Sequence, residues 1–315
     1  MTLLFSYDDS ASRGLPAGVE VSVEPSDAGW THAGLQVRRL AAGEPQIVRT
    51  GECEMFVLPL AGSLDVAVAA SASRHEIEAR FHLEGRDSVF SRVTDFAYVG
   101  RDSVIELVSD QDAEVALPSA RCGRRLTPVY GPAQAVPVEV RGAGNATRQV
   151  TNFGSPSAWD HADRLICCEL ITPAGNWSSY PPHKHDLTRP CTVANEEIYY
   201  YRIAGADSVT PSRTGYGLHV TSTGPEHDAA GFTPLDERIL VRDGDVVVVP
   251  YGYHGPCAAA PGYDMYYLNV LAGPGELRSM AFCDHADHAW VRTTWNEMTP
   301  DPRCPVTSAE GRVAH

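Results

Sequence analysis

The stretch that decides the fold of this chain is Asn176–Asp186, which reads NWSSYPPHKHD. It places His183 and His185 one residue apart, directly behind two prolines. Residues i and i+2 of a β-strand point to the same face, so both imidazoles can reach one metal ion from one strand. The alternative interpretation is that both are surface histidines of a proline-rich loop, because a bare H-x-H motif is only a hypothesis.

Two later segments supply further donors for the same ion. Glu197 lies in the strand-like run EEIYYYRI, and His254 follows in DGDVVVVPYGYHGP. Three histidines and one carboxylate, spread over three strands, predict a metal site with open positions for a substrate. Imidazole and carboxylate donors suit several divalent ions; zinc and manganese are favoured here, with iron, nickel and cobalt as alternatives.

Strand alternation decides which neighbouring side chains face the ion. Glu196 and Glu197 are adjacent, so only one of them can point inward, and we choose Glu197. On this phase Tyr199 and Tyr201 also face inward. Lys184 lies between the two histidines and is expected to point away from the metal.

Outside these motifs the chain reads as short strands separated by Gly, Pro, Asp and Asn, which predicts an all-β protein. The first half (GECEMFVLPLAG) and the second half (ANEEIYYYRIAG) are faintly similar. A repeat this long favours two copies of one β-barrel. We predict an N-terminal barrel over 1–125, a linker over 126–150 and a C-terminal barrel over 151–315. Only the second half has the H-x-H pair, so the N-terminal barrel is expected to be metal-free and to serve structure or assembly.

Composition excludes several classes of partner. The formal net charge of −15 argues against nucleic acid and anionic membranes, which need clustered Lys and Arg. No apolar run approaches the roughly 18 residues of a membrane span. The eight cysteines form no C-x-x-C pair and do not look like a disulfide framework, so a cytoplasmic location is expected. His161, His219 and His227 lie in polar, loop-like sequence and are expected at the surface.

The motifs resemble those of the cupin superfamily. The first cupin motif combines H-x-H, a Glu and a Gly, and the second runs from Gly through Pro-x-Gly to His. Two spacings depart from the usual pattern: the interval before the Glu is longer, and the interval before the last His is one residue shorter. The matching residues here are His183, His185, Glu197, Gly205, Gly244, Pro250, Gly252 and His254.

A narrower resemblance covers about residues 51–295. NWSSYPPHKHD, EEIYYYR, VPYGYHGP and APGYDMYYLNVLAGP are similar to the 5-deoxy-glucuronate isomerases of bacterial inositol catabolism. This resemblance implies a bicupin of two double-stranded β-helix (jelly-roll) barrels. It also implies a metal-dependent aldose–ketose isomerisation of 5-deoxy-glucuronate to 5-dehydro-2-deoxy-gluconate. The loop after HKHD, LTRPCTVAN, lacks the acidic residues typical of the family, so a different sugar acid is an alternative substrate.

The implied reaction needs a group that moves a proton and a cation that holds the substrate carboxylate. Tyr199, Tyr253 and Lys184 are candidates for the first role, as is a water or hydroxide on the metal. Arg148 and Arg202 are candidates for the second, because arginine binds carboxylates with two hydrogen bonds. Arg202 lies on the outward phase of its strand, which counts against it.

Two other functions stay open at this point. A cupin dioxygenase uses the same three-histidine, one-glutamate set with a redox metal, and a storage-type bicupin binds without catalysis. The expected partner is a small sugar acid. A homodimer is expected from the barrel edges and the apolar strands of the first half.

Overall fold

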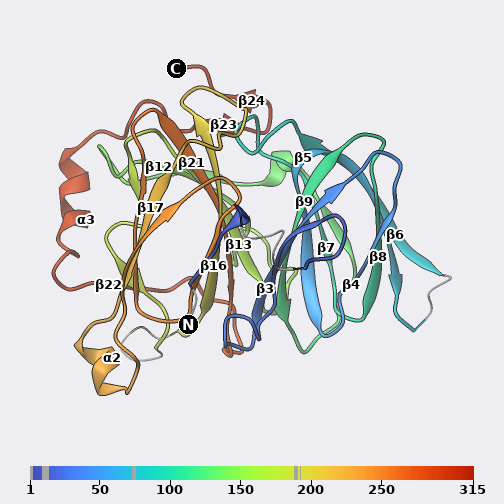
Figure 1. The fold of residues 1–315 in the computed structure, drawn as a ribbon, viewed down its shortest axis with the longest axis horizontal. Coiled ribbons are helices and arrows are strands. Elements are labelled where there is room, and N and C mark those ends of the chain that lie inside the picture. Colours follow the sequence, from blue (N-terminus) through green and yellow to red (C-terminus); the bar gives the residue numbers. More distant parts are fainter. Residues whose placement is uncertain (1–2, 9–13, 73–75, 188–190, 192) are drawn as a thin grey trace.

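Two β-barrels lie side by side in the computed structural model of this chain, which describes residues 3–8, 14–72, 76–187, 191 and 193–315 (Figure 1). The prediction of an all-β protein with two barrels is confirmed. The described helices are short, and none has the length and apolar character needed to cross a membrane. They are α2 (Pro225–Ala229), α3 (Val291–Thr294) and the 3-10 turns η2 (Ala133–Ala135) and η3 (Trp295–Glu297).

The N-terminal barrel is built from one nine-stranded sheet that curls on its longest strand, β5 (Cys53–Ala70). The first part of β5 pairs with β7 and β9, and its second part pairs with β6 and β8. A separate apolar core, which includes Val57 and Leu107, fills this barrel. The other strands are β2 (Val19–Val23), β3 (Ala33–Leu40), β4 (Gln46–Arg49), β6 (Ile77–Arg86), β7 (Phe96–Val99), β8 (Ser103–Val108), β9 (Ala113–Arg121) and β10 (Val129–Gly131).

The C-terminal barrel consists of a seven-stranded and a six-stranded sheet. The first sheet runs in the order β1 (Leu4–Phe5), β19 (Val246–Val249), β16 (Glu196–Gly205), β21 (Tyr263–Ala272), β13 (Ile166–Thr172), β12 (Arg148–Gly154) and β11 (Val138–Arg141). The second runs β18 (Asp236–Val241), β17 (Gly217–Ser222), β20 (Tyr253–Ala259), β15 (His183–Lys184) and β22 (Cys283–Asp284), and β14 (Trp177–Ser178) also pairs with β20. A small hairpin, β23 (Thr307–Ser308) and β24 (Gly311–Arg312), ends the chain.

Strand β16 is buried on both faces, and this explains why its central run, IYYY, shows no alternation of apolar and polar residues. Tyr199 and Tyr201 point into the C-terminal barrel, as the alternation predicted. Ile198 and Tyr200 point the other way, into the apolar core between the barrels. Glu196 also points away from the barrel interior: its carboxylate accepts hydrogen bonds from the backbone N–H groups at the start of β3.

The chain passes from one barrel to the other where the sequence predicted a linker over 126–150. Strand β10 pairs with β7 of the first barrel, while β11 and β12 already belong to the second. Strand β1, near the N-terminus, pairs with β19 and so also belongs to the C-terminal barrel. The boundaries 1–125 and 126–150 are therefore corrected, because Pro and Gly marked turns between paired strands rather than a free connection.

Candidate metal centre and its cavity

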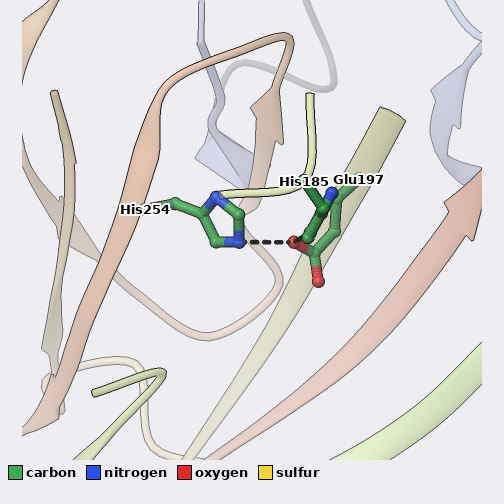
Figure 2. A group of neighbouring side chains, drawn as sticks. All are labelled: His185, Glu197 and His254. Atoms are coloured by element: carbon green, nitrogen blue, oxygen red, sulfur yellow. Dashed lines mark hydrogen bonds and ion pairs between the residues drawn. The ribbon is translucent and has the colours of Figure 1, made fainter. Parts of the chain in front are cut away.

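Three buried side chains of the C-terminal barrel converge on one point (Figure 2). Their ligand atoms all lie within 4.8 Å of one another. Nε2 of His185 and Nε2 of His254 each lie 3.0 Å from Oε2 of Glu197. His185 directly follows β15, His254 lies in β20 and Glu197 lies in β16, so three segments far apart in sequence position one centre.

The fourth expected ligand, His183, lies beside this group but outside it. Its ring centroid is 4.5 Å from that of His254 and 6.3 Å from that of His185. Cross-strand pairing explains the closeness to His254, because the two residues are direct partners in the β15–β20 ladder. His183 lines the same cavity as His185 and Glu197.

All three histidines use their second ring nitrogen in the same way. Nδ1 of His183, His185 and His254 lies 3.1–3.3 Å from the backbone carbonyls of Pro181, Asn195 and Gly252, respectively. This contact fixes the ring orientation and leaves the lone pair of Nε2 available to bind a metal, the arrangement typical of metal-binding histidines. Nε2 of His254 is buried with no hydrogen-bond partner, although it lies near the Glu197 carboxylate. The donor set therefore fits a divalent metal ion.

The charge states of Glu197 and His183 suit the same conclusion. Burial alone would raise the pKa of Glu197, but His254 and His185 hold it far below its ordinary value. Burial, followed by the proximity of the other two histidines, lowers the pKa of His183 well below its ordinary value. A carboxylate and a neutral imidazole are the forms that bind metals.

A tight turn brings the metal-binding strand against β20. Ser179 has a left-handed backbone with φ of 46°, and Gly255 has φ of 88°. A Cβ atom at Gly255 would lie 1.8 Å from the carbonyl oxygen of Ser179, so only glycine fits there. The side chain of Ser179 then points inward, with Oγ 3.2 Å from the hydroxyl of Tyr199 and 3.1 Å from that of Tyr267.

The opposite face of the HKHD segment holds helix α2. Nζ of Lys184 lies 2.9 Å from Oε1 of Glu226, which also accepts the hydroxyl of Tyr253 at 2.5 Å. Oδ2 of Asp186 lies 2.8 Å from Nε2 of His227. Lys184 therefore points away from the metal ligands, as expected, and it and Tyr253 are engaged outside the cavity, where neither is placed to move a substrate proton.

A cavity of about 380 Å³ opens from the metal centre, within the size range of small-molecule sites. Tyr199 and Arg148, two of the residues predicted to act on the substrate, line it. Arg202 does not: it pairs with Glu114 and Asp243 between the barrels, so its suggested contact with substrate is corrected. The further lining residues are Glu139, Arg141, Val150, Asn152, Ser155, Ser157, Cys168, Leu170, Ser179, His183, His185, Glu197, Asn269, Leu271, Met280, Phe282 and Arg292.

Two histidines expected at the surface are fully buried, which corrects that prediction. His219 packs inside the barrel, with Nδ1 2.6 Å from the Tyr201 hydroxyl. His227 accepts the backbone N–H of Gly224 at the start of α2. Both lie in locally polar sequence, and the tertiary fold brings a distant partner to each ring: Tyr201 to His219 and Asp186 to His227.

One disulfide joins Cys191 to Cys283, whereas the sequence indicated none. The bond ties the loop after His185 to β22, which pairs with β15. The two cysteines are far apart in sequence, so spacing alone could not identify the pair. Of the atypical loop LTRPCTVAN, residues 188–190 and 192 lie outside the described residues.

Asn269 and Ser179 are among the polar cavity residues that the sequence did not indicate. Asn269 stands at an inward position of the otherwise apolar strand DMYYLNVLAG, and that isolated amide is the signal that could have identified it. Ser179 gave no such signal, because its inward direction depends on the left-handed turn.

Comparisons with known proteins agree with this architecture. The sequence model of the KduI/IolB family matches residues 9–291. A protein of Geobacillus kaustophilus (strain HTA426) named 5-deoxy-glucuronate isomerase is 37% identical over 283 residues, covering 87% of this chain and 91% of the relative. The protein of that name from Bacillus subtilis (strain 168) is 32% identical, covering 89% and 94%. The resemblance drawn from the motifs is confirmed.

Solved structures place the fold among the cupins. An IolB-like protein from Salmonella typhimurium LT2 superimposes with a TM-score of 0.77 at 31% identity, covering 92% of this chain and 99% of that one. The oxalate decarboxylase of Lactobacillus farciminis, in a formate complex, gives a TM-score of 0.59 at 10% identity, covering 90% and 88%. The second likeness concerns the fold alone, and together they support an all-β bicupin.

Proposed function

Because this chain belongs to the KduI/IolB family, we propose that it is a metal-dependent aldose–ketose isomerase acting on 5-deoxy-glucuronate. The product would be 5-dehydro-2-deoxy-gluconate, in the degradation of inositol. The observation that carries this proposal is the buried His185–Glu197–His254 group at the head of a cavity of sugar-acid size.

The segments around β15, β16 and β20 aim their donor atoms at one point. His185, Glu197 and His254, with His183 beside them, would hold a divalent ion, and we propose zinc or manganese. When bound, the ion supplies Lewis-acid polarisation of the substrate carbonyl.

Of Tyr199, Tyr253 and Lys184, only Tyr199 lines the cavity, so it is the remaining side-chain candidate for proton transfer. Its hydroxyl contacts Ser179 at the cavity wall. Burial raises the pKa of Tyr199 well above its ordinary value, so the phenol stays protonated at neutral pH. We therefore assign it the role of hydrogen-bond donor to a substrate oxygen, where it steadies developing negative charge.

The direct experiment is an assay of the purified protein on 5-deoxy-glucuronate, with metal analysis of the same sample. We expect ketose formation that stops on treatment with a chelator and returns when the metal is restored. Full activity in a metal-stripped sample would contradict the proposal. Consumption of oxygen, with no reaction under anaerobic conditions, would instead support a dioxygenase.

A second measurement separates the two routes of isomerisation. If a base transfers the proton through an enediol, slow turnover in deuterated water places deuterium in the product. Complete absence of label would indicate hydride transfer within the substrate. Tyr199→Phe should lower kcat on either route, because the hydroxyl donates to a substrate oxygen in both.

We further propose a cytoplasmic homodimer. Six of the eight cysteines are free, which suits a reducing compartment, although Cys191 and Cys283 form a disulfide. Trp177, Leu218 and Leu240 are each more than 40% exposed and lie in one cross-strand row on β14, β17 and β18, an apolar strip that supports self-association. Light scattering on the wild type and on Leu218→Glu checks this: a monomeric wild type would contradict it.

A further inference from the structure

The cavity contains one arginine whose charge has no acidic partner. Arg141 pairs with Glu139 at 2.8 Å, and Arg292 pairs with Asp284 at 2.7 Å. Arg148 forms no ion pair with any described carboxylate. It is only 4% exposed, its Nε has no hydrogen-bond partner, and one of its other nitrogens donates to the carbonyl of Ala146.

The only other cavity-lining side chain with an unpartnered buried atom, among the described residues, is Asn269. Its Nδ2 has no hydrogen-bond partner, and the residue is 4% exposed. Unpaired buried donors are costly, since each forfeits its hydrogen bonds to water. A cationic donor and an amide donor that line one cavity therefore point to a ligand with oxygen acceptors at two places.

Strand register gives the order of these groups relative to the metal ligands. On β21, Leu271 pairs with Glu197, which marks the level of the metal centre. Asn269 lies two residues further along β21 and pairs with Tyr199. Each two-residue step along a strand is about 7 Å and returns to the same face. The amide therefore lies one step away from the metal, beside the phenol assigned to the substrate.

An apolar step and then the arginine follow in the same direction. Two residues beyond Asn269, Tyr267 pairs with Leu170, and Leu170 pairs with Val150 on β12. Leu170 and Val150 are buried neighbours in the barrel interior, and both line the cavity. Arg148 lies two residues beyond Val150 on the same face. Along the strands the wall thus reads amide, aliphatic pair, cation.

We propose that Asn269, the Val150–Leu170 pair and Arg148 form a substrate-reading wall, in which Asn269 binds a hydroxyl, the aliphatic pair packs against the methylene and the Arg148 guanidinium binds the carboxylate. The inference rests on the proposed function. An open-chain 5-deoxy uronic acid has its aldehyde at one end, hydroxyls in the middle, and a methylene next to the terminal carboxylate. With the aldehyde at the metal centre, the carboxylate would be met by the guanidinium at the end of the long Arg148 side chain, which lines the same cavity as the metal ligands.

The wall would also select against the ordinary hexuronic acid. Glucuronate has a hydroxyl where the 5-deoxy acid has its methylene. That hydroxyl would be buried against Val150 and Leu170, which offer no hydrogen bond. Burial lowers the pKa of Arg148 to about 10, which still leaves the guanidinium charged at neutral pH and able to hold a carboxylate.

The charge is tested with Arg148→Met, assayed on 5-deoxy-glucuronate and on the neutral sugar 5-deoxy-glucose. We expect kcat/KM to fall about 100-fold on the acid and less than about 3-fold on the neutral sugar, because one charged hydrogen-bonding group is lost. Arg148→Lys should recover part of the loss. Arg141→Met is the matched control, since Glu139 already neutralises that arginine, and its effect on the acid should be much smaller. Equal losses on both substrates, or equal effects of the two Met variants, would overturn the assignment.

The contacts of Val150 and Asn269 with the substrate are tested by changing the polarity of each side chain. Val150→Thr adds a hydroxyl at nearly constant volume and should raise the ratio of kcat/KM for glucuronate over the 5-deoxy acid by about 10-fold or more. Asn269→Leu should raise KM about 10-fold for both acids while metal content and melting temperature stay unchanged. An unchanged ratio in Val150→Thr would contradict the contact with the methylene. An unchanged KM in Asn269→Leu would contradict the contact with the hydroxyl.

Binding without turnover separates this inference from the proposed function. The probe is 5-deoxy-glucuronate reduced with borohydride, which keeps the carboxylate but cannot isomerise. If the wild type isomerises no sugar, the proposed function is wrong. Calorimetry still tests the wall in that case: wild-type binding that Arg148→Met weakens about 100-fold supports it, and equal affinity in both proteins rejects it.

Discussion

Two glutamates occupy matching places in the repeated sequence but perform different tasks. Glu197 points into its own barrel and joins the metal ligands. Glu54, in CEMFVLPLAG, points toward the other barrel, where its carboxylate accepts the backbone N–H groups of Asp163 and Leu165 and the hydroxyl of Tyr98 at 2.6–2.8 Å. A shift of one residue in strand phase is enough to move a side chain to the other face.

At the residue scale we predict that His254→Ala and His183→Ala lose bound metal and isomerase activity while the fold survives. Each substitution removes an imidazole whose Nδ1 contacts a backbone carbonyl and whose Nε2 is left available to bind a metal. We therefore expect the main loss to be in metal affinity rather than in folding stability. Metal affinity should fall by more than the roughly 10–100-fold cost of losing an outer partner of a ligand. Metal analysis and circular dichroism check this, with His82→Ala in the N-terminal barrel as control. Retained metal in His254→Ala would exclude that residue as a ligand.

At the element scale, the HKHD segment works through both of its faces. One face presents His183 and His185 to the cavity, and the other holds α2 through Lys184 and Asp186. Asp186 also accepts the backbone N–H of Gly252 at 2.6 Å, two residues before His254. The helix and the turn before β20 thus keep the ligand-bearing strands in register.

The anchoring of α2 predicts a pH-dependent stability. Burial would raise the pKa of Glu226, but hydrogen bonds from Lys184 and Tyr253 lower it to about 2, against an ordinary value of 4.5. A depressed carboxyl pKa contributes stability above the unfolded value and loses it as the pH falls toward the folded one. Glu226→Gln should therefore cost about 1–3 kcal/mol at pH 7 and pH 5, and progressively less between pH 4.5 and pH 2. Urea unfolding across this range, with the exposed Glu237→Gln as control, checks it; a pH-independent difference would contradict it.

At the scale of the whole molecule, the barrels share a core and buried charges. Phe56 of the first barrel packs edge-on against Phe153 of the second, at 5.4 Å between ring centroids. Arg86 and Glu169 form an ion pair across the interface with side chains 2% and 4% exposed, and Tyr266 donates to the same carboxylate. The N-terminal barrel therefore stabilises the strands on which the metal centre is built.

We predict that Glu169→Leu destabilises the protein by about 3–5 kcal/mol, because it leaves the buried Arg86 without a counter-charge. The double variant Arg86→Met/Glu169→Leu should recover most of that loss, since no charge then stays buried. Arg238→Ala, which breaks an exposed pair with Asp236, is the control and should have no resolvable effect. Denaturant unfolding measures all four proteins, and equal losses in the single and double variants would contradict the prediction.

The sequence by itself determined the strand content, the two-barrel repeat, and the direction of His185, Glu197 and Tyr199, because alternation along a strand is a local rule. The motif order also identified the family. Only the tertiary structure decided which faces meet. It buried His219 and His227, moved Arg202 to the barrel interface, and left Arg148 and Asn269 with unpartnered atoms in the cavity. Whether a polar side chain finds its partner depends on residues far away in the chain, and no local pattern contains that information.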